Sequence, residues 1–237
     1  MSMKCIVLPN QLAEGRLLSF YLAMEEYVAL HVDDEDDLFF LWQVEPSVIF
    51  GRNQLMENEV NVPYCQEHGI RLFQRKSGGG CVYADKGNVM LSYVTREENV
   101  GLAFNRFMGM VLLVLRRMGI EAVGTSHNDV LVEGRKVCGT ACYKLAGHCI
   151  VHSTFLYDTN MDHMLNAITP SSEKLQSKGI QSVRQRITLL KDYTSMSLDE
   201  VKTHILQTLC VGERILTTAD VAEIEQLATM NYQLRTE

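Results

Sequence analysis

The residues best suited to bind an anion are a basic pair and three glycines within residues 74–88. Arg75 carries a fixed positive charge on a planar fork of donors, which suits phosphate or carboxylate oxygens. The glycines, residues 78–80, stand between two strand-like segments, where glycine marks a tight bend or a close approach of a ligand to the backbone. Two interpretations follow: a glycine-rich hairpin turn with a surface arginine, or a ligand-binding bend.

A second segment, residues 128–141, brings a lysine next to small residues. An Asn-Asp pair leads into a short strand, a Glu-Gly turn and a second strand that begins with Lys136. Gly139, Thr140 and Ala141 follow on that strand and leave room for a ligand beside the lysine. A strand lysine on its own is usually a solvated residue. Its combination with the glycine segment favours a site.

Composition narrows the class of partner. The chain has 237 residues, 46% of them hydrophobic, which is enough for one large globular domain or two small ones. Its net charge of -7 argues against nucleic acid, which requires a basic surface, but leaves room for a small anion held by a local cluster. No apolar run reaches the length of a membrane span, and the first ten residues lack the pattern of a signal peptide. We therefore expect a cytoplasmic protein.

Seven cysteines raise the question of zinc. Cys138, Cys142 and Cys149 lie close in sequence to His148 and His152, and the first two have a spacing that fits a zinc site. No second pair completes a usual ligand set, and the cysteines fall within strand-like segments. Reduced and mostly buried thiols are the favoured interpretation.

The elements that must position these residues mix helices and strands. A helix over about residues 14–30 is predicted from the spacing of Leu17, Leu18, Tyr21, Leu22, Glu25 and Val28. A strongly apolar helix is predicted over residues 100–118, and two capping boxes start later helices, Ser197 with Glu200 and Thr217 with Asp220. Strands are predicted at residues 38–44, 47–50, 70–74, 81–83, 89–95, 130–132, 136–143 and 150–157. The last three read as an antiparallel meander, so we expect one α+β or mixed α/β domain.

Five segments in a fixed order carry a resemblance to a known family. The motif Arg-x-Ser/Thr-Gly-Gly-Gly-x-Val-aromatic is matched by residues 75–83, and Gly-Arg-Lys-Val/Ile-x-Gly-Ser/Thr-Ala, followed by His-x-Thr, is matched by residues 134–154. Shorter matches lie at residues 22–26, 48–52 and 177–184. Together they make the chain, from about residue 17 to 190, resemble the lipoate–protein ligase A family of the biotin and lipoate ligases.

The resemblance implies a fold and a reaction. The fold is a biotin/lipoate ligase-like catalytic domain with mostly antiparallel mixed sheets flanked by helices. In the reaction, the lipoate carboxylate attacks the α-phosphorus of ATP, giving lipoyl-AMP and pyrophosphate. A lysine of an acceptor protein then attacks the acyl carbonyl and releases AMP. Neither step needs a protein nucleophile, but both need fixed positive charge where negative charge gathers.

The resemblance also assigns residues. Lys136 is the expected catalytic residue, in contact with the carboxylate or acyl oxygen and with the α-phosphate. The residues expected to bind ATP or lipoyl-AMP are Arg75, Ser77, Gly78, Gly79, Gly80, Cys81, Val82, Tyr83, Asn128, Asp129, Lys136, Gly139, Thr140 and Ala141. Those expected to bind lipoate are Gly79, Lys136, His152 and Thr154. Asp129 is the candidate ligand for magnesium, and Lys178 and Arg184 are candidates for positive charge near the acceptor.

The implied small molecules are ATP, magnesium and lipoate, and the implied acceptors are lipoyl domains of 2-oxoacid dehydrogenase complexes or the glycine-cleavage H protein. Many family members carry a C-terminal accessory domain, and some have it on a separate polypeptide that adenylation needs. The chain stops at Glu237, so we expect a single catalytic domain, residues 1–237, without the accessory domain. A ligase subunit that needs a partner and transfers only from lipoyl-AMP therefore stays open.

The sequence departs from the family at the glycine motif. Gln74 stands where a second arginine is usual, and Ala84 stands before Asp85 where histidine is usual. The nearest rival is an octanoyl or lipoyl transferase of the same fold, whose cysteine nucleophile would lie around residues 121–124, where this chain has none. A non-catalytic binding protein is a further alternative, but it would have less need of both Arg75 and Lys136. A Walker-type nucleotidase is disfavoured, because the glycines are not followed by Gly-Lys-Ser/Thr at the start of a helix.

Overall fold

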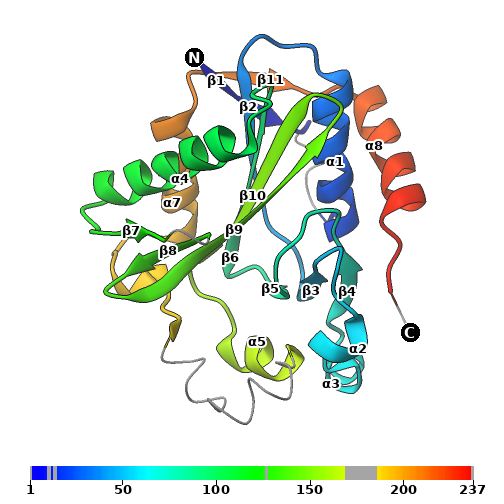
Figure 1. Cartoon of the computed structure of the whole chain (residues 1–237), viewed down its shortest axis with the longest axis vertical. Coiled ribbons are helices and arrows are strands. Elements are labelled where there is room, and N and C mark those ends of the chain that lie inside the picture. The colour runs from blue at the N-terminus through cyan, green and yellow to red at the C-terminus, as the bar shows by residue number, and fades with distance from the viewer. Residues whose placement is uncertain (1, 10–11, 13–14, 126–127, 169–185, 236–237) are drawn as a thin grey trace.

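The computed structural model describes residues 2–9, 12, 15–125, 128–168 and 186–235. Its largest element is an eight-stranded sheet in the order β11-β1-β2-β6-β10-β9-β8-β7 (Figure 1). The strands are β1 (Met3–Val7), β2 (Asp37–Trp42), β6 (Asn88–Thr95), β7 (Val123–Gly124), β8 (Asp129–Val132), β9 (Arg135–Leu145), β10 (His148–Leu156) and β11 (Gly212–Ile215). β1 pairs parallel with β11 and β2, and the other pairings of this sheet are antiparallel.

A smaller sheet carries the glycine bend. Its middle strand, β3 (Ser47–Phe50), pairs parallel with β4 (Arg71–Gln74) on one edge and antiparallel with β5 (Val82–Ala84) on the other. The interpretation of the glycines as a hairpin turn is therefore wrong, because β4 and β5 lie on opposite edges of β3. The bend crosses over the end of β3 instead.

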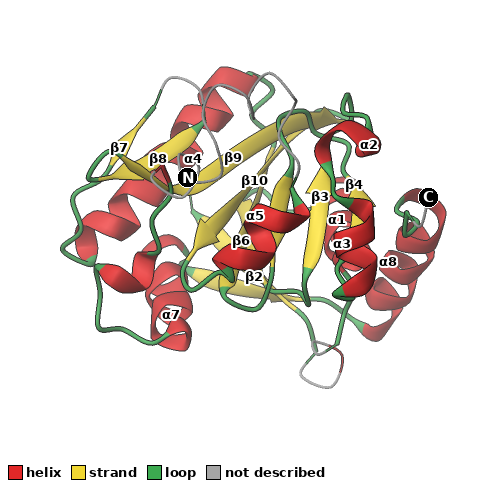
Figure 2. Cartoon of the chain, turned by 90° about the horizontal axis from the view of Figure 1, so that it is seen from below, coloured by secondary structure: helices red, strands yellow, loops and turns green. Residues whose placement is uncertain are grey.

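Helices cover both faces of the large sheet (Figure 2). α1 (Leu18–His31) and α8 (Thr218–Asn231) contribute to one hydrophobic cluster, and α4 (Val100–Arg117) and α7 (Leu198–Leu209) contribute to the other. A third cluster joins the small sheet to α2 (Met56–Glu59), α3 (Val62–Glu67) and α5 (Met161–Ala167). Within the described ranges, no helix has the length and apolar character needed to cross a bilayer.

The central strand β6 is buried along its whole length. Because successive side chains of a strand point to opposite faces, Met90 and Val94 join the cluster of α1, while Leu91 and Tyr93 join the cluster of α4. Buried on both faces, β6 is mainly apolar from residue 89 to 94, with Ser92 as the one polar residue in that run, and this is why the sequence predicts it well.

The predicted α+β fold, with mainly antiparallel sheets flanked by helices, is confirmed. The meander of β8, β9 and β10 turns at Glu133-Gly134 and Ala146-Gly147, and all four residues have positive φ, as two-residue hairpin turns require. Both capping boxes form, at Ser197 and at Thr217. The prediction missed the short elements β1, β7, β11, α2, α3 and α5.

Candidate active site

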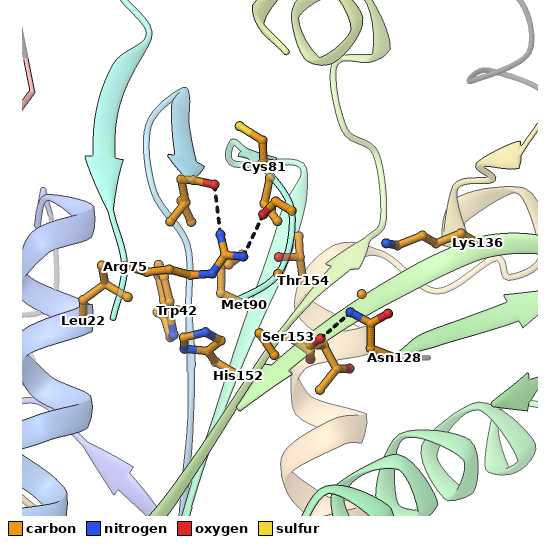
Figure 3. A pocket seen from close by; sticks show the side chains of 17 residues that line it. Leu22, Trp42, Arg75, Cys81, Met90, Asn128, Lys136, His152, Ser153 and Thr154 are labelled. Carbon is orange, nitrogen blue, oxygen red and sulfur yellow. Dashed lines mark hydrogen bonds between the residues drawn. The ribbon is translucent and has the colours of Figure 1, made fainter. Parts of the chain in front are cut away.

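Lys136 and the glycine bend line one cavity of about 100 Å³ between the two sheets (Figure 3). The bend contributes Gly79 and Gly80, and the lysine comes from the start of β9. The cavity is lined by Leu22, Trp42, Ile49, Arg75, Gly79, Gly80, Cys81, Val82, Met90, Asn128, Lys136, Gly139, Thr140, Ala141, His152, Ser153 and Thr154. Two motifs that lie about fifty residues apart in sequence therefore meet at one site, as the sequence predicts.

A second, more apolar cavity of about 220 Å³ meets the first at Lys136. The residues that line it are Cys81, Val82, Tyr83, Lys136, Gly139, Thr154, Leu156, Met164, Leu165, Ile168 and Ile187. Cys81, Val82, Lys136, Gly139 and Thr154 line both cavities. Lys136 is thus the one basic side chain that the described residues contribute to both.

The amino group of Lys136 is held by an ion pair. Its Nζ lies 2.7 Å from Oδ1 of Asp129, and about a third of each side chain is exposed. Asp129 faces Gly139 in the register of β8 and β9. A Cβ atom at Gly139 would lie 2.7 Å from the Nζ of Lys136, so the absence of a side chain at 139 gives the lysine its place. Of the small residues after Lys136, Gly139 is needed for this reason.

Asn128 fixes the start of the meander. Its side-chain amide donates to the carbonyl of Thr140 over 2.9 Å, and its own carbonyl accepts from the Thr140 amide over 2.9 Å. Its φ of 145° is unusual for a residue with a side chain, and such strained backbone is concentrated at functional sites. Asn128 lines the first cavity, and its bond to Thr140 uses one of the two hydrogens of its side-chain NH2 group.

Arg75 is buried behind the bend and is only 5% exposed. Its Nη2 donates to the carbonyls of Gly78 and Gly80 over 2.7 Å each, and its Nη1 donates to the carbonyl of Ile49 over 3.0 Å. Its Nε donates to the hydroxyl of Ser77 over 2.9 Å. Burial lowers the pKa of Arg75 to about 10, which leaves it charged at neutral pH.

Four of the five N–H groups of Arg75 are used inside the protein, so its geometry indicates that it holds the bend in shape. The contact with phosphate oxygens expected from the sequence stays a prediction, which only the remaining Nη1 hydrogen and the exposed edge of the group could satisfy.

The bend also requires glycine where it crosses β3. A Cβ at Gly51 would lie 2.4 Å from the carbonyl oxygen of Gly79. The amide of Arg52 donates to the carbonyl of Ser77 over 3.0 Å, which ties the bend to the residue after Gly51. Gly79 itself has a φ of 89°, which a residue with a Cβ rarely adopts. Close backbone contact and positive φ therefore explain two glycines of the family motifs.

Most of the expected site residues line the two cavities. Ser77, Gly78 and Asp129 line neither: Ser77 is fully buried behind the bend, and Asp129 reaches the site through its ion pair. Lys178 and Arg184 lie outside the described residues. The cavity residues that were not expected are Leu22, Trp42, Ile49, Met90, Ser153, Leu156, Met164, Leu165, Ile168 and Ile187.

The thiols at the site are protonated at neutral pH. Cys81 lines both cavities, and burial raises its pKa to about 12. Burial also raises the pKa of Cys138 to about 11 and that of Cys142 to about 12. In the part of the chain that the structure describes, no group of three His, Cys, Asp or Glu side chains could hold a metal ion.

Comparisons with known proteins agree with the family resemblance of the sequence motifs. A family model, the lipoyl protein ligase A/B catalytic domain, matches residues 18–210. The chain is 34% identical to lipoate-protein ligase LplJ of Bacillus subtilis and 34% identical to lipoate–protein ligase 1 of Staphylococcus aureus. Each match covers 90% of this chain and 67% of the relative.

Solved structures share the fold. A bipartite lipoate protein ligase from Thermoplasma acidophilum, described with its E2 lipoyl domain, has a TM-score of 0.81 and 24% identity over 97% of this chain and 92% of its own. A lipoate-protein ligase A bound with ATP has a TM-score of 0.78 and 22% identity over 97% and 95%. The match of the family model and the identity to the two bacterial ligases, together with this fold, show that the chain belongs to the lipoyl protein ligase A/B catalytic domain family.

Proposed function

We propose that the chain activates lipoate with ATP to form lipoyl-AMP and transfers the lipoyl group to a lysine of an acceptor domain. The observation that carries the proposal is that Lys136 stands where two cavities meet beside the glycine bend. The names of the bacterial relatives and the ATP-bound structure of a related ligase support these substrates.

The two cavities suit the two halves of lipoyl-AMP. The first is narrow and has an apolar inner wall of Leu22, Trp42 and Met90, which fits a single acyl chain with its ring. The second is about twice as large and its wall includes Tyr83 and Met164, which fits the wider adenosine group. The acyl–phosphate linkage then falls at the junction, next to Lys136.

At that junction Lys136 would serve both steps. In the first, its ammonium group lies between two anions, the lipoate carboxylate and the α-phosphate, and offsets their repulsion as the new bond forms. In the second, it stabilises the charge that develops on the acyl oxygen while AMP leaves. The backbone of Gly79 and Gly80 allows the substrate to lie against the bend without side-chain contact.

Asp129 would hold Lys136 in place for both steps. The ammonium group of Lys136 pairs with the carboxylate of Asp129. Before substrate binds, Asp129 would hold the ammonium group of Lys136 at the junction of the two cavities. The carboxylate and phosphate of the substrates would then replace Asp129 as its partners, or pair with it in addition to Asp129.

Magnesium fits the site in a limited way. Among the described residues, Asp129 is the carboxylate that pairs with Lys136, so the protein would supply one ligand and the phosphates of ATP the others, as is usual for this ion. Magnesium would neutralise phosphate charge during adenylation. The involvement of magnesium, and of Asp129 as its ligand, is part of this proposal.

Acceptors would be lipoyl domains, of 2-oxoacid dehydrogenase complexes or the H protein. The solved Thermoplasma ligase is described as bipartite and with its E2 lipoyl domain, which supports both a lipoyl-domain acceptor and a separate accessory polypeptide. We propose that residues 1–237 act as one catalytic domain that carries out both steps; in the partner-dependent alternative, adenylation is the step that the separate polypeptide would serve.

Lipoate-dependent exchange of pyrophosphate into ATP tests the first step, and transfer from synthetic lipoyl-AMP to a lipoyl domain tests the second. Exchange by the chain alone is the expected result. Transfer without exchange would leave the partner-dependent version, and failure of both would end the proposal. The rival transferase needs a reactive thiol, whereas burial raises the pKa of Cys81, the cysteine at the junction, to about 12.

A further inference from the structure

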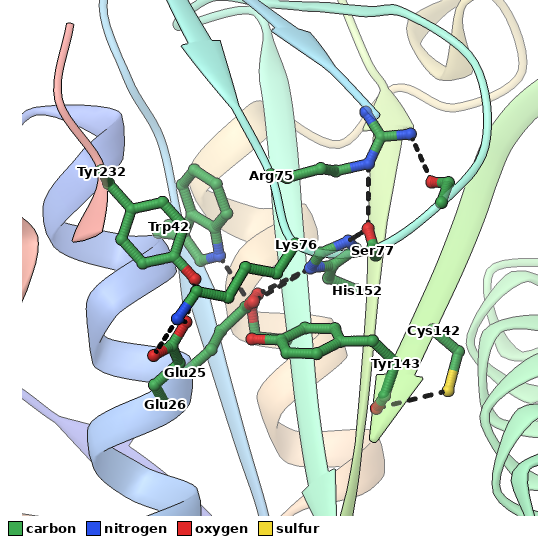
Figure 4. A network of polar contacts seen from close by, with 12 residues as sticks. Glu25, Glu26, Trp42, Arg75, Lys76, Ser77, Cys142, Tyr143, His152 and Tyr232 are labelled. Carbon is green, nitrogen blue, oxygen red and sulfur yellow. Dashed lines mark hydrogen bonds and ion pairs between the residues drawn. The ribbon is translucent and has the colours of Figure 1, made fainter. Parts of the chain in front are cut away.

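Two adjacent glutamates of α1 are buried beneath the glycine bend (Figure 4). Glu25 is 0% exposed and Glu26 is 3% exposed. A carboxylate is almost never fully buried unless hydrogen bonds or opposite charge compensate for its lost hydration. The hydrogen-bond and ion-pair partners of Glu25 and Glu26 therefore indicate which part of the structure the two buried carboxylates hold.

Glu25 accepts hydrogen bonds from two directions. From the sheet, the Trp42 Nε1 donates to the hydroxyl of Ser92 over 2.9 Å, and that hydroxyl donates to Oε1 of Glu25 over 2.6 Å. On the side that faces the bend, the Nδ1 of His152, a residue of β10, lies 3.0 Å from Oε2 of Glu25. The other ring nitrogen of His152, Nε2, lies 2.7 Å from the hydroxyl of Ser77.

One consistent set of donation directions starts from Arg75, which can only donate. Its Nε donates to the hydroxyl of Ser77, so the Ser77 hydrogen is free to point at the Nε2 of His152. In this arrangement the Nε2 of His152 accepts from Ser77, and its Nδ1 donates to Glu25. Each hydrogen bond of this network, from the bend to α1, then has one donor and one acceptor, which is the condition for a stable buried network.

Glu26 holds the preceding residue of the bend. The Nζ of Lys76 lies 2.6 Å from Oε1 of Glu26, and the hydroxyl of the buried Tyr232 donates to the same oxygen. Lys76 also lies over the ring of Tyr232, 5.3 Å from its centre. Consecutive acids on the helix therefore hold consecutive residues of the bend, Lys76 and Ser77.

Glycines 78–80 have no side chains of their own with which to fix their position. The carbonyls of Gly78 and Gly80 are held by Arg75, and the two residues before the glycines are held by α1, directly or through His152. Neither glutamate lines the cavities described above, and neither does Ser77. An effect of these residues on catalysis would therefore act through the bend, or through His152 in the lining of the first cavity, and not through their own contact with substrate.

We propose that Glu25 and Glu26 are positioning residues that fix the glycine bend, through His152 and Ser77 in one case and Lys76 in the other. The bend in turn sets where an acyl carboxylate lies relative to Lys136; this consequence for catalysis rests on the proposed function. A displacement of reacting groups by about 1 Å can lower a rate constant about a hundredfold.

The test compares Ser77→Ala, Glu25→Gln and Glu26→Gln with Tyr93→Phe as the matched control. Tyr93 also makes a buried hydrogen bond to a carboxylate, that of Asp37 over 2.6 Å, but lies in the cluster of α4, away from the bend. Two measurements are made: cleavage by trypsin under native conditions after Arg75 and Lys76, read by mass spectrometry, and kcat and KM for lipoate-dependent pyrophosphate exchange.

We expect cleavage within the bend to rise about tenfold in all three bend variants, because proteolysis follows the population of the open form. We expect kcat to fall about tenfold to a hundredfold with a smaller change in KM. Combining Ser77→Ala with Glu25→Gln should cost little more than the worse single change, since both break one chain, whereas Glu26→Gln should add to Ser77→Ala. Tyr93→Phe should lower the melting temperature without changing either measurement.

Unchanged cleavage and kcat in Ser77→Ala would overturn the proposal. So would cleavage and kcat that merely follow the melting temperature across all four variants, the control included. If the wild-type chain shows no exchange at all, transfer from lipoyl-AMP replaces it as the assay. If both reactions fail, the proposed function is lost while the cleavage result still decides whether α1 fixes the bend.

Discussion

The amino group of Lys136 occupies the space that a side chain at Gly139 would fill. A Cβ at that glycine would lie 2.7 Å from Nζ and 2.8 Å from Cε of the lysine, both far closer than such atoms approach one another. The position of the proposed catalytic charge therefore depends on a residue three places further along the same strand.

Gly139→Ala is expected to displace the end of Lys136 and leave the fold intact, because the lysine tail is flexible. The kcat for pyrophosphate exchange should fall about tenfold to a hundredfold. The control is Gly109→Ala on the exposed side of α4, where a Cβ meets nothing within 4 Å and should slightly stabilise the helix. Wild-type kcat in Gly139→Ala would show that the lysine does not need its observed position.

Lys136→Met removes the charge and keeps the length of the side chain. Loss of a single donor of this kind costs about 3 kcal/mol of transition-state stabilisation, so kcat for both half-reactions should fall about a hundredfold or more. Lys144→Met, on the exposed part of the same strand and paired only with Glu98 at 3.7 Å, serves as the control and should keep wild-type rates. Equal losses in the two variants would point to damage of β9.

Gly51→Ala should displace the backbone of the glycine bend at Gly79. The added Cβ would lie 2.4 Å from the carbonyl oxygen of Gly79, which is backbone and cannot rotate away. We expect a loss of about 1–3 kcal/mol in the free energy of unfolding, as for other overpacked sites, together with reduced binding of lipoate. Urea unfolding and equilibrium dialysis measure the two. A variant with unchanged stability and binding would mean that the bend has room to move.

Alkylation should leave the activity intact near neutral pH. Because the pKa of Cys81 is raised to about 12, only about one molecule in ten thousand carries its thiolate at pH 8. Iodoacetamide at pH 8 should therefore label this thiol slowly, as followed by peptide mass spectrometry, and exchange activity should persist. Rapid labelling of Cys81 with parallel loss of activity would favour the transferase mechanism.

Stability should fall at alkaline pH. Burial raises the pKa of Cys65 and Cys138 to about 11 and that of Cys81 and Tyr93 to about 12 in the folded chain. Above about pH 9 the unfolded chain releases protons from these groups while the folded chain retains them. The unfolded state then binds fewer protons, so the free energy of unfolding decreases with rising pH. Thermal melts between pH 7 and 10.5 should show this decrease, and a flat profile would contradict the burial of these groups.

The sequence predicted best what is encoded locally. The long helix α4 and the hairpin turns of the meander have signals within a few residues, and the cavity-lining residues from the bend and β9 belong to motifs with a fixed order. The edge strand β11, Gly-Glu-Arg-Ile, has no such signal, because its partner β1 lies about two hundred residues earlier. Its existence depends on tertiary pairing alone.

The roles of the bend residues were harder to predict, since they depend on partners that a motif does not name. Arg75 reads as a phosphate ligand until its contacts with backbone carbonyls are known. The walls of the second cavity come from α5 and residues near it, which are ordinary apolar residues in sequence. One signal was available: Glu25 falls at a helical position otherwise taken by apolar residues, which marks a buried acid in need of a partner.

The pairing of β1 with β11 bears on the order in which the molecule can assemble. Lys4 is in register with Gly212, so the outer edge of β1 is closed only after a segment about two hundred residues later in the sequence has emerged. Contacts this distant in sequence are slow to form, because a long loop must close first. A chain still leaving the ribosome would thus expose the edge of β1 until β11 has emerged. Misfolding by pairing of this exposed edge would be most favoured in that interval.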